Sequence, residues 1–352
     1  MVQSKKRILF TLPNFKTAGS QFVLLGIYQR LDRDLWDPYV MVEKYPEHIP
    51  NNISENQRLY LPKDKPAPYI RKLTKLLRKR KIDLVHSWDY RSSSIEAIAC
   101  RLAKVPYLYT KKNNSWSKRW LAKSILSKHV AYDNPEMQSR FFDHPLVKRK
   151  ATFIPHGIDT NQFAPRDVPK KTNDFRVGCV GVIGPNKNQW FLLKALTNLP
   201  NHFKVRLFGN ADNDYLKVLQ DYMKEERLEA RVSFEGHITH EQIPQVMAQL
   251  DVLVLPSHHE GLPVTILEAM ACGLPVLSSD SGGGARFLLK EGGGAIFQLE
   301  DTSELQKQLL MLEQQPDIRK QWGMKGRATV KQKFSIDQEV EAYHELYKNL
   351  LA

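Results

Sequence analysis

The chain has 352 residues, 42% of them hydrophobic and 26% charged, with a net charge of +14. This composition is typical of two or three globular domains and excludes a disordered polypeptide, and no run approaches the roughly 18–20 apolar residues of a membrane span. Up to residue 165 there are 30 Lys and Arg against 14 Asp and Glu, which indicates an anionic partner for the N-terminal half, although a solvated basic face would carry the same charge. A membrane surface or a phosphate-bearing acceptor is favoured over nucleic acid, because no nucleic-acid-binding signature accompanies the charge.

Short apolar runs typical of buried β-strands alternate with helical patterns along most of the chain. The first series of predicted strands is Ile8–Leu12, Pro38–Val42, Asp83–His86, Tyr107–Thr110, Val130–Tyr132 and Thr152–Ile154. The second series is Phe175–Val182, Phe203–Phe208, Val232–Phe234, Val252–Leu255, Val276–Ser278 and Ala295–Phe297. Strands separated by helices predict βαβ units, and therefore an α/β fold with a parallel sheet in each half. We expect two Rossmann-like domains that face an interdomain cleft, with ligands beyond the carboxyl ends of the strands.

Residues 155–172, rich in Pro, Asp and Lys, separate the two series and are predicted to form a linker. We therefore expect an N-terminal domain over residues 1–165, a second domain over residues 166–334 and a closing helix over residues 335–352.

Two predicted helices concentrate the positive charge. Tyr69–Ile82 places four aliphatic side chains at helical spacing among basic ones, and Trp116–Lys128 combines two tryptophans with four basic residues. A basic amphipathic helix can lie in a lipid interface, so we consider peripheral contact with an anionic membrane for either segment. Both segments also fall where a helix would cover a sheet, so packing against the core alone is the favoured explanation and membrane contact is a hypothesis.

The cysteines indicate the compartment. Cys100, Cys179 and Cys272 are widely spaced and form no metal or redox motif, which is typical of a reducing environment. The first residues pass from basic side chains directly into a strand-like run, without the apolar region and cleavage site of a signal peptide. We expect a cytoplasmic protein, peripheral at the inner face of the cell membrane if the basic half binds lipid.

The most specific segment is Leu255–Val276, with the sequence LPSHHEGLPVTILEAMACGLPV. An apolar strand leads into a loop with Glu260, and a Gly-Leu-Pro turn leads into a helix that contains Glu268. Pro263 suits an early helical position, and the free N–H groups and macrodipole at a helix start favour a diphosphate. Glu260 is expected before this helix and Glu268 within it, so one carboxylate can accept hydrogen bonds from sugar hydroxyls and the other from a second diol such as a ribose.

This segment resembles the signature of glycosyltransferase family 4, in which two glutamates separated by seven residues stand in the setting PSxxEGLPxxxLEAMACGLPV. The resemblance extends to Phe153–Asp159 (FIPHGID), to Val232–Ser257 and to Lys333–Leu351, which is similar to the family's closing helix. It implies a retaining, nucleotide-sugar-dependent enzyme with the GT-B fold, whose C-terminal helix packs back toward the N-terminal domain.

The resemblance also implies roles for matching residues. Glu260 would hold hydroxyls of the donor sugar, and Glu268 would bind the ribose of the nucleotide. Lys187, in the segment VGVIGPNKN, would neutralise the diphosphate leaving group as a fixed cation at the developing charge. Five further residues would contact sugar and diphosphate through their backbone: Gly261, Leu262, Pro263, Val264 and Thr265.

Two more contacts are implied away from this segment. Gly19, in the loop after the first strand, would lie close to the diphosphate. Gly236 and His237 would fall in the region that meets the nucleobase, largely through backbone.

The chain departs from the family pattern in three places. Val182 stands where the family usually has arginine, so a second cation for the phosphates is missing, and Arg286 stands where glutamate is usual. Arg286 is a candidate to replace the missing cation. On the acceptor side, Thr110–Asn114 stands where many members have a histidine, and His86 and Asp89 are nearby candidates, each equally explained as a satisfied loop residue.

We expect neither a metal nor a cofactor. Asp212–Asp214 has the Asp-x-Asp shape of metal-dependent sugar transferases, but such spacing is common by chance and GT-B enzymes generally bind diphosphate without metal. His258 and His259 lack the i, i+4 spacing of a helical zinc site.

The resulting expectation is a hexosyl- or N-acetylhexosaminyltransferase. It would move a sugar from a nucleotide diphosphate donor, with a UDP-sugar preferred, to a hydroxyl of a glycan or lipid-linked acceptor in cell-envelope polysaccharide or glycolipid assembly. The alternative is a catalytically degenerate GT-B protein that binds nucleotide or glycan without turnover, for which Val182 and Arg286 speak. A sugar-nucleotide epimerase of the same fold is a third reading.

Overall fold

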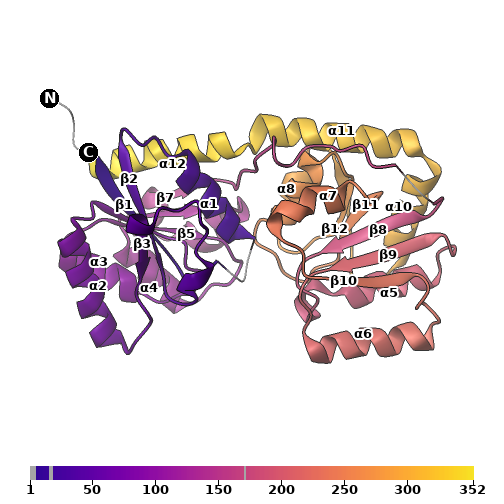
Figure 1. The fold of residues 1–352 in the computed structure, drawn as a ribbon, viewed down its shortest axis with the longest axis horizontal. Helices are drawn as coiled ribbons and strands as arrows, with labels where there is room; N and C mark the ends of the chain where they lie inside the picture. Colours follow the sequence, from indigo (N-terminus) through magenta and orange to yellow (C-terminus); the bar gives the residue numbers. More distant parts are fainter. Residues whose placement is uncertain (1–4, 16–18, 170–171) are drawn as a thin grey trace. The chain divides into compact units, whose positions relative to one another are not determined.

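The computed structural model describes residues 5–15, 19–169 and 172–352. The chain divides into two compact units, Met1–His156 with Ile336–Ala352, and Gly157–Ser335 (Figure 1). Each unit has a parallel sheet of its own, so the expected α/β fold with one sheet in each half is confirmed.

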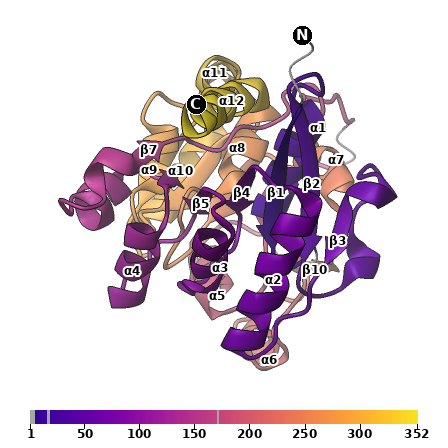
Figure 2. The same ribbon diagram turned by 90° about the vertical axis from the view of Figure 1, so that its left-hand side faces the viewer.

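The first unit is built on a seven-stranded sheet with the order β3-β2-β1-β4-β5-β6-β7 (Figure 2). Its strands are β1 (Lys6–Leu12), β2 (Trp36–Val42), β3 (Arg58–Tyr60), β4 (Leu84–Ser87), β5 (Tyr107–Lys111), β6 (His129–Tyr132) and β7 (Ala151–Phe153). Its helices are α1 (Ser20–Arg30), α2 (Pro66–Arg80), α3 (Ile95–Ala103), α4 (Lys118–Leu126) and α12 (Ile336–Leu351), with short turns at Pro46–His48, Glu55–Gln57, Gln138–Phe142 and Lys148–Lys150. Strand β3 was not predicted, because only Leu59 of its three residues is buried and no apolar run marks it.

The second unit is built on a six-stranded sheet with the order β10-β9-β8-β11-β12-β13. Its strands are β8 (Phe175–Val180), β9 (Phe203–Phe208), β10 (Val232–Gly236), β11 (Val252–Leu255), β12 (Val276–Ser279) and β13 (Gly294–Phe297). Its helices are α5 (Gln189–Thr197), α6 (Asn213–Glu225), α7 (Ile243–Met247), α8 (Val264–Ala271), α9 (Gly284–Leu289), α10 (Ser303–Gln314) and α11 (Pro316–Lys333), with turns at Pro185–Lys187 and His240–Gln242.

In both sheets the strand order reverses beside the first strand. The chain runs outward from β1 to β3 on one side and from β4 to β7 on the other, and the second sheet repeats this around β8 and β11. After β8 and β11 the chain therefore continues to opposite sides of the sheet, and the carboxyl edge at such a reversal is where doubly wound sheets bind ligands.

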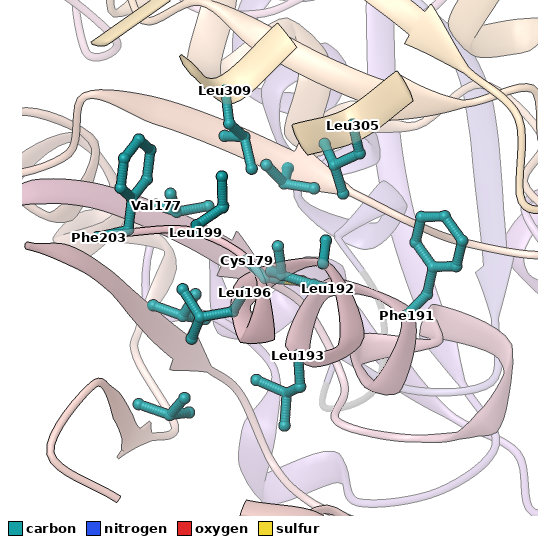
Figure 3. Packing of buried hydrophobic residues seen from close by; sticks show 14 of the residues in the cluster. Val177, Cys179, Phe191, Leu192, Leu193, Leu196, Leu199, Phe203, Leu305 and Leu309 are labelled. Carbon is teal, nitrogen blue, oxygen red and sulfur yellow. The ribbon is translucent and has the colours of Figure 1, made fainter. Parts of the chain in front are cut away.

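The core of the second unit lies between its sheet and the helices that cover it. Side chains of α5 and α10 pack against β8 and β9, with Leu192, Leu196, Leu305 and Leu309 at most 1% exposed (Figure 3). A second cluster of the same unit contains Phe163, which is fully buried although it lies in the predicted linker. The first part of that segment is therefore packed structure.

Helix α12 is held to the first unit by buried polar contacts as well as apolar ones. The Tyr347 hydroxyl lies 2.7 Å from His86 Nδ1, the Tyr343 hydroxyl lies 2.8 Å from Thr110 Oγ1, and His86 Nε2 lies 2.8 Å from the same Thr110 oxygen. All four side chains are buried. His86 is thus part of a packed network, and burial lowers its pKa to about 3.

A buried ion triad ties α12 to the end of the sheet. His156 Nε2 lies 3.2 Å from Asp133 Oδ2 and His156 Nδ1 lies 3.2 Å from Glu339 Oε1, with no side chain more than 1% exposed. Burial by itself would lower the pKa of His156, but the two carboxylates outweigh it and raise the pKa to about 9. The imidazole is therefore charged in the folded protein at neutral pH.

This triad should make stability fall in alkaline solution. Because the folded pKa of His156 is above the unfolded value of 6.5, its contribution is complete below pH 6.5 and is lost as pH rises through about 9. We expect the difference in unfolding free energy between wild type and His156→Gln to shrink by about 3 kcal/mol over this range in chemical denaturation. A difference that stays constant with pH would contradict the assignment.

The difference is the right observable, because two lysines act in the opposite direction. Burial lowers the pKa of Lys111 and Lys112 to about 7, so these lysines make stability rise with pH over the same range. Both lysines are present in wild type and in His156→Gln, so most of their contribution is removed when the two proteins are compared.

Among the residues that the structure describes, no helix has the length and apolarity needed to cross a membrane. The three cysteines are buried and unpaired.

Candidate functional site

The loop after β8 at the carboxyl edge of the second sheet, residues 181–188, contains Lys187 and forms the basic loop of the site. Strand β8 ends two residues earlier than predicted, because Gly181 turns the chain with a φ of +146°. Gln189, which is 1% exposed, holds the loop on both sides: its Nε2 donates to the Val182 carbonyl at 3.1 Å, and its Oε1 accepts from the Gly184 N–H at 3.2 Å. This loop presents Lys187, and a side chain on Gly181 would come within 3.3 Å of the lysine Cε.

The loop after β11, the strand next to β8, spans residues 256–263, contains Glu260 and forms the acidic loop of the site. Its backbone is joined to the basic loop, since the His258 N–H donates to the Asn186 carbonyl at 2.8 Å and Asn186 Nδ2 donates to the His259 carbonyl at 3.0 Å. The Glu260 N–H donates to the Ser281 carbonyl at 2.7 Å, which fixes the loop from the side of β12. None of these positioning contacts follows from the sequence alone, because they join segments far apart in the chain.

These two loops bring together the two predicted catalytic residues. Lys187 Nζ lies 2.5 Å from Glu260 Oε1, with the side chains 22% and 14% exposed. A fixed cation beside a fixed carboxylate at the strand reversal can bind a phosphate with one group and hydroxyls with the other. Lys187 and Glu260 are 73 residues apart in the chain, so it is the folded structure that brings them into contact.

Three glycines lie along the neighbouring edge of the sheet, where the backbone packs closely at one end and leaves space at the other. Gly181, Gly209 and Gly236 follow one another across the ends of β8, β9 and β10, and the Gly209 N–H donates to the Gly236 carbonyl at 2.7 Å. A side chain on Gly209 would lie 2.0 Å from the Gly181 carbonyl oxygen, whereas Gly236 has no atom within 4 Å of such a position. Gly236 and the adjoining His237 are exposed, and their predicted contact with a nucleobase remains a prediction. Gly209 was not among the residues predicted from the sequence.

The second predicted glutamate lies on α8. The helix begins at Val264, so Pro263 is the residue before the helix and not within its first turn as expected. Glu268 is 3% exposed, and His240 Nε2 lies 3.4 Å from its Oε1. The His240 ring in turn packs edge-on against Phe163, with centroids 5.1 Å apart. His240 is a neighbour that the sequence analysis did not single out.

One glycine sets the space available to the acidic loop. An added Cβ on Gly284, the first residue of α9, would lie 1.9 Å from the Gly261 carbonyl oxygen. We expect Gly284→Ala to displace the Gly261 loop, to lower the unfolding free energy by about 1–3 kcal/mol and to lower activity by at least about tenfold. Thermal unfolding and a transfer assay measure the two effects.

Gly184→Ala is the matched control for this substitution. Gly184 has extended backbone with a φ of −172°, and an added Cβ would meet only Val182 Cγ1 at an ordinary 3.8 Å. Equal losses in the two variants would show that close packing against Gly261 is not the cause.

The structure shows the surroundings of two residues that depart from the family pattern and of the Asp-x-Asp segment. Val182 is 54% exposed and offers no cation. Arg286 Nη2 lies 2.5 Å from Asp280 Oδ2, so the arginine considered as a substitute pairs with this carboxylate. Asp212 Oδ1 accepts from the Tyr215 N–H at 3.0 Å and caps α6, which explains this acid without a metal. In the described ranges, no group of three or more His, Cys, Asp or Glu side chains is placed to hold a metal ion.

The predicted positions in the first unit are less informative. Gly19 is exposed immediately before α1, with no atom within 4 Å of an added Cβ, and residues 16–18 of its loop lie outside the described residues. Asp89 is 4% exposed and pairs with Arg91 at 2.8 Å, and His86 is in the buried network of α12. Both acceptor-side candidates are therefore satisfied within the unit.

Comparison with known proteins assigns the class. Residues 160–329 match the family described as "Glycosyl transferases group 1", and residues 17–162 match "Glycosyltransferase Family 4". The chain is a glycosyltransferase with two parallel-sheet domains of the GT-B type. It belongs to glycosyltransferase family 4.

Individual relatives agree with this assignment. The glycosyltransferase EpsF of Bacillus subtilis is 26% identical over 80% of this chain and 81% of its own. The UDP-Gal:alpha-D-GlcNAc-diphosphoundecaprenol alpha-1,3-galactosyltransferase of Escherichia coli is 27% identical over 65% of this chain and 66% of its own. The crystal structure of Anabaena HepE in complex with UDP superposes with a TM-score of 0.82 at 22% identity, covering 97% of this chain and 100% of that one, which shows the shared fold.

Proposed function

We propose that this protein is a retaining glycosyltransferase that transfers a hexosyl or N-acetylhexosaminyl group from a UDP-sugar to a hydroxyl of a glycan or lipid-linked acceptor. The assembly of cell-envelope polysaccharide or glycolipid is the setting that suits such an acceptor. The single observation that carries the proposal is the Lys187–Glu260 pair at the strand reversal of the second sheet.

The two charged groups of the pair contact different parts of the donor. The Lys187 ammonium binds the diphosphate and stabilises its charge as the sugar leaves, while the Glu260 carboxylate accepts hydrogen bonds from sugar hydroxyls. The backbone N–H groups of Gly261, Leu262, Val264 and Thr265 lie at the start of α8, where the helix dipole favours the same diphosphate; Pro263 between them has no N–H to donate. Gly19 is proposed to approach the diphosphate through its backbone.

The nucleoside is proposed to contact Glu268 and the exposed end of β10. The buried Glu268 carboxylate accepts from the ribose hydroxyls, and the exposed glycine edge at Gly236 and His237 leaves room for a flat base. Uracil is favoured because the named donor of the Escherichia coli relative is UDP-Gal and the Anabaena neighbour holds UDP. GDP-mannose is the named donor of another relative, from Corynebacterium glutamicum, so the base has to be tested directly.

The reaction needs no nucleophile from the protein. The diphosphate oxygen takes the proton of the acceptor hydroxyl on the face that it leaves, so the new bond forms with the original anomeric configuration. The protein contributes orientation and electrostatic stabilisation.

Calorimetric titration with UDP, GDP and ADP, followed by NMR of the product formed from the matching nucleotide-sugar, tests the proposal. We expect micromolar affinity, about −8 kcal/mol, for UDP and an α-linked product from an α-linked donor. A β-linked product would overturn the retaining mechanism. Nucleotide binding without transfer to any acceptor would favour the degenerate protein that Val182 suggests, and release of a free epimer would favour an epimerase.

A further inference from the structure

A groove lies on the outer surface of the first unit, between α2 and α3. The two helices lie side by side, and Thr74 Oγ1 donates to the Ala99 carbonyl at 3.3 Å (Figure 2). The groove has a volume of about 900 Å³. It is separate from the donor residues, which all belong to the second unit apart from Gly19.

The floor of this groove is apolar and in contact with solvent. Ile70 of α2 and Ile98 and Leu102 of α3 line it, and Ile98 and Leu102 are 37% and 54% exposed. Helix α2 packs into the core through Tyr69, Leu73 and Leu77, and Ile70 is partly buried against the same cluster, so the exposed Ile98 and Leu102 are the apolar residues of the groove that the core does not use.

The rim of the groove is basic. Arg71, Lys75, Arg78 and Lys79 line it, and in this described part of the chain no Asp or Glu does. The whole of α2 carries six basic residues and no acidic one. An apolar floor with a cationic rim matches the acyl boundary and phosphate headgroups of an anionic bilayer, because long basic side chains extend toward phosphates while aliphatic side chains enter the interface.

The structure distinguishes the two basic helices that are equivalent in the sequence. On the α4 side the tryptophans pack on the protein, since Trp120 is 3% exposed and the ring of the partly buried Trp116 stacks on Phe141 with centroids 5.0 Å apart. Lys123 is fully buried and donates to the Arg91 carbonyl at 2.9 Å. Helix α4 therefore packs in the core, whereas α2 and α3 leave aliphatic residues exposed among cations.

We infer that the α2–α3 groove is the surface by which this protein binds membranes that contain anionic phospholipid. Headgroup phosphates lie against the four cations of the rim, and Ile98 and Leu102 enter the boundary between headgroups and acyl chains. This surface goes beyond sugar transfer, because it uses none of the residues that the donor needs.

Vesicle flotation tests the inference on the full chain. We expect binding to phosphatidylcholine vesicles with about 30 mol% phosphatidylglycerol, little binding to phosphatidylcholine alone, and weakening at high salt. Lys75→Glu/Lys79→Glu should lower the apparent affinity by at least about tenfold, given the attraction that each surface cation contributes. Leu102→Asn should lower it without changing the salt dependence, since this substitution removes only apolar contact.

Lys118→Glu/Arg119→Glu on α4 is the matched control. It changes the net charge by the same amount on two exposed residues of the same unit, and it should keep near wild-type affinity. Thermal unfolding and UDP titration of every variant establish that fold and donor site are intact, so failure of lipid binding and failure of the proposed function are read separately.

Three results would overturn the inference. Equal weakening by the α4 control would show that total charge acts and not this groove. Equal binding to neutral vesicles would remove the role of the cations. Tighter binding of a short DNA duplex than of anionic vesicles, lost in Lys75→Glu/Lys79→Glu, would assign the surface to nucleic acid.

Discussion

Replacing Lys187 by alanine is expected to lower kcat for sugar transfer by about 10²–10³-fold, the range found for single electrostatic groups that stabilise developing charge. Lys187 is the cation that the basic loop holds beside Glu260, and Val182 supplies none nearby. The substitution should leave the fold intact, because the lysine side chain is 22% exposed and packs in no core cluster. Steady-state kinetics with the nucleotide-sugar identified by titration gives the measurement.

The division of the effect between kcat and KM carries the information. A cation that acts on the leaving diphosphate lowers kcat and kcat/KM together, whereas one that only anchors the donor raises KM and leaves kcat unchanged. The second pattern would contradict the role of Lys187 at the leaving group. Lys187→Arg keeps the charge on a side chain of different shape, and we expect it to recover part of the lost activity.

Replacing Glu268 by alanine is expected to weaken UDP binding by about 10–100-fold, since hydrogen bonds to a charged acceptor contribute about 1.5–3 kcal/mol. Glu268 is almost fully buried, so a carboxylate at this position needs polar partners, and His240 supplies one. Calorimetric titration with UDP measures the loss.

Glu260→Ala is the matched comparison for Glu268→Ala. Glu260 is proposed to contact the sugar, which UDP lacks, so its substitution should leave the affinity for UDP nearly unchanged and abolish most transfer. Equal loss of UDP affinity in both variants would mean that the two glutamates do not divide the donor into sugar and ribose.

Much of the fold could be predicted because buried parallel strands are marked by apolar runs. Twelve strands were predicted, and every one overlaps an observed strand, while β3 has a single buried residue and leaves no such mark. The site residues of Leu255–Val276 could also be predicted, because the strand, turn and helix that hold them are contiguous in the chain.

The residues that the sequence could not reveal act across the fold. Gly284 leaves space for Gly261, and His240 contacts Glu268, over separations in the chain that no local pattern spans. Gln189 orders the basic loop from only five to seven residues away, through side-chain hydrogen bonds that the residue type does not predict. The two basic helices show the same limit, because an amphipathic stripe among basic residues is compatible with burial and with lipid contact. The structure separates them, since Trp120 and Lys123 of α4 are buried whereas Ile98 and Leu102 beside α2 are exposed.

The path of the chain through the first unit has a consequence for synthesis on the ribosome. That unit is discontinuous, since the whole of Gly157–Ser335 is inserted between His156 and Ile336. The inserted unit can fold from a continuous nascent segment, but the first-begun unit lacks Tyr343, Tyr347 and Glu339 until α12 has been synthesised. Until then the buried polar groups of His86, Thr110 and His156 have no partners from α12, so the unit that is begun first is completed only after the inserted unit.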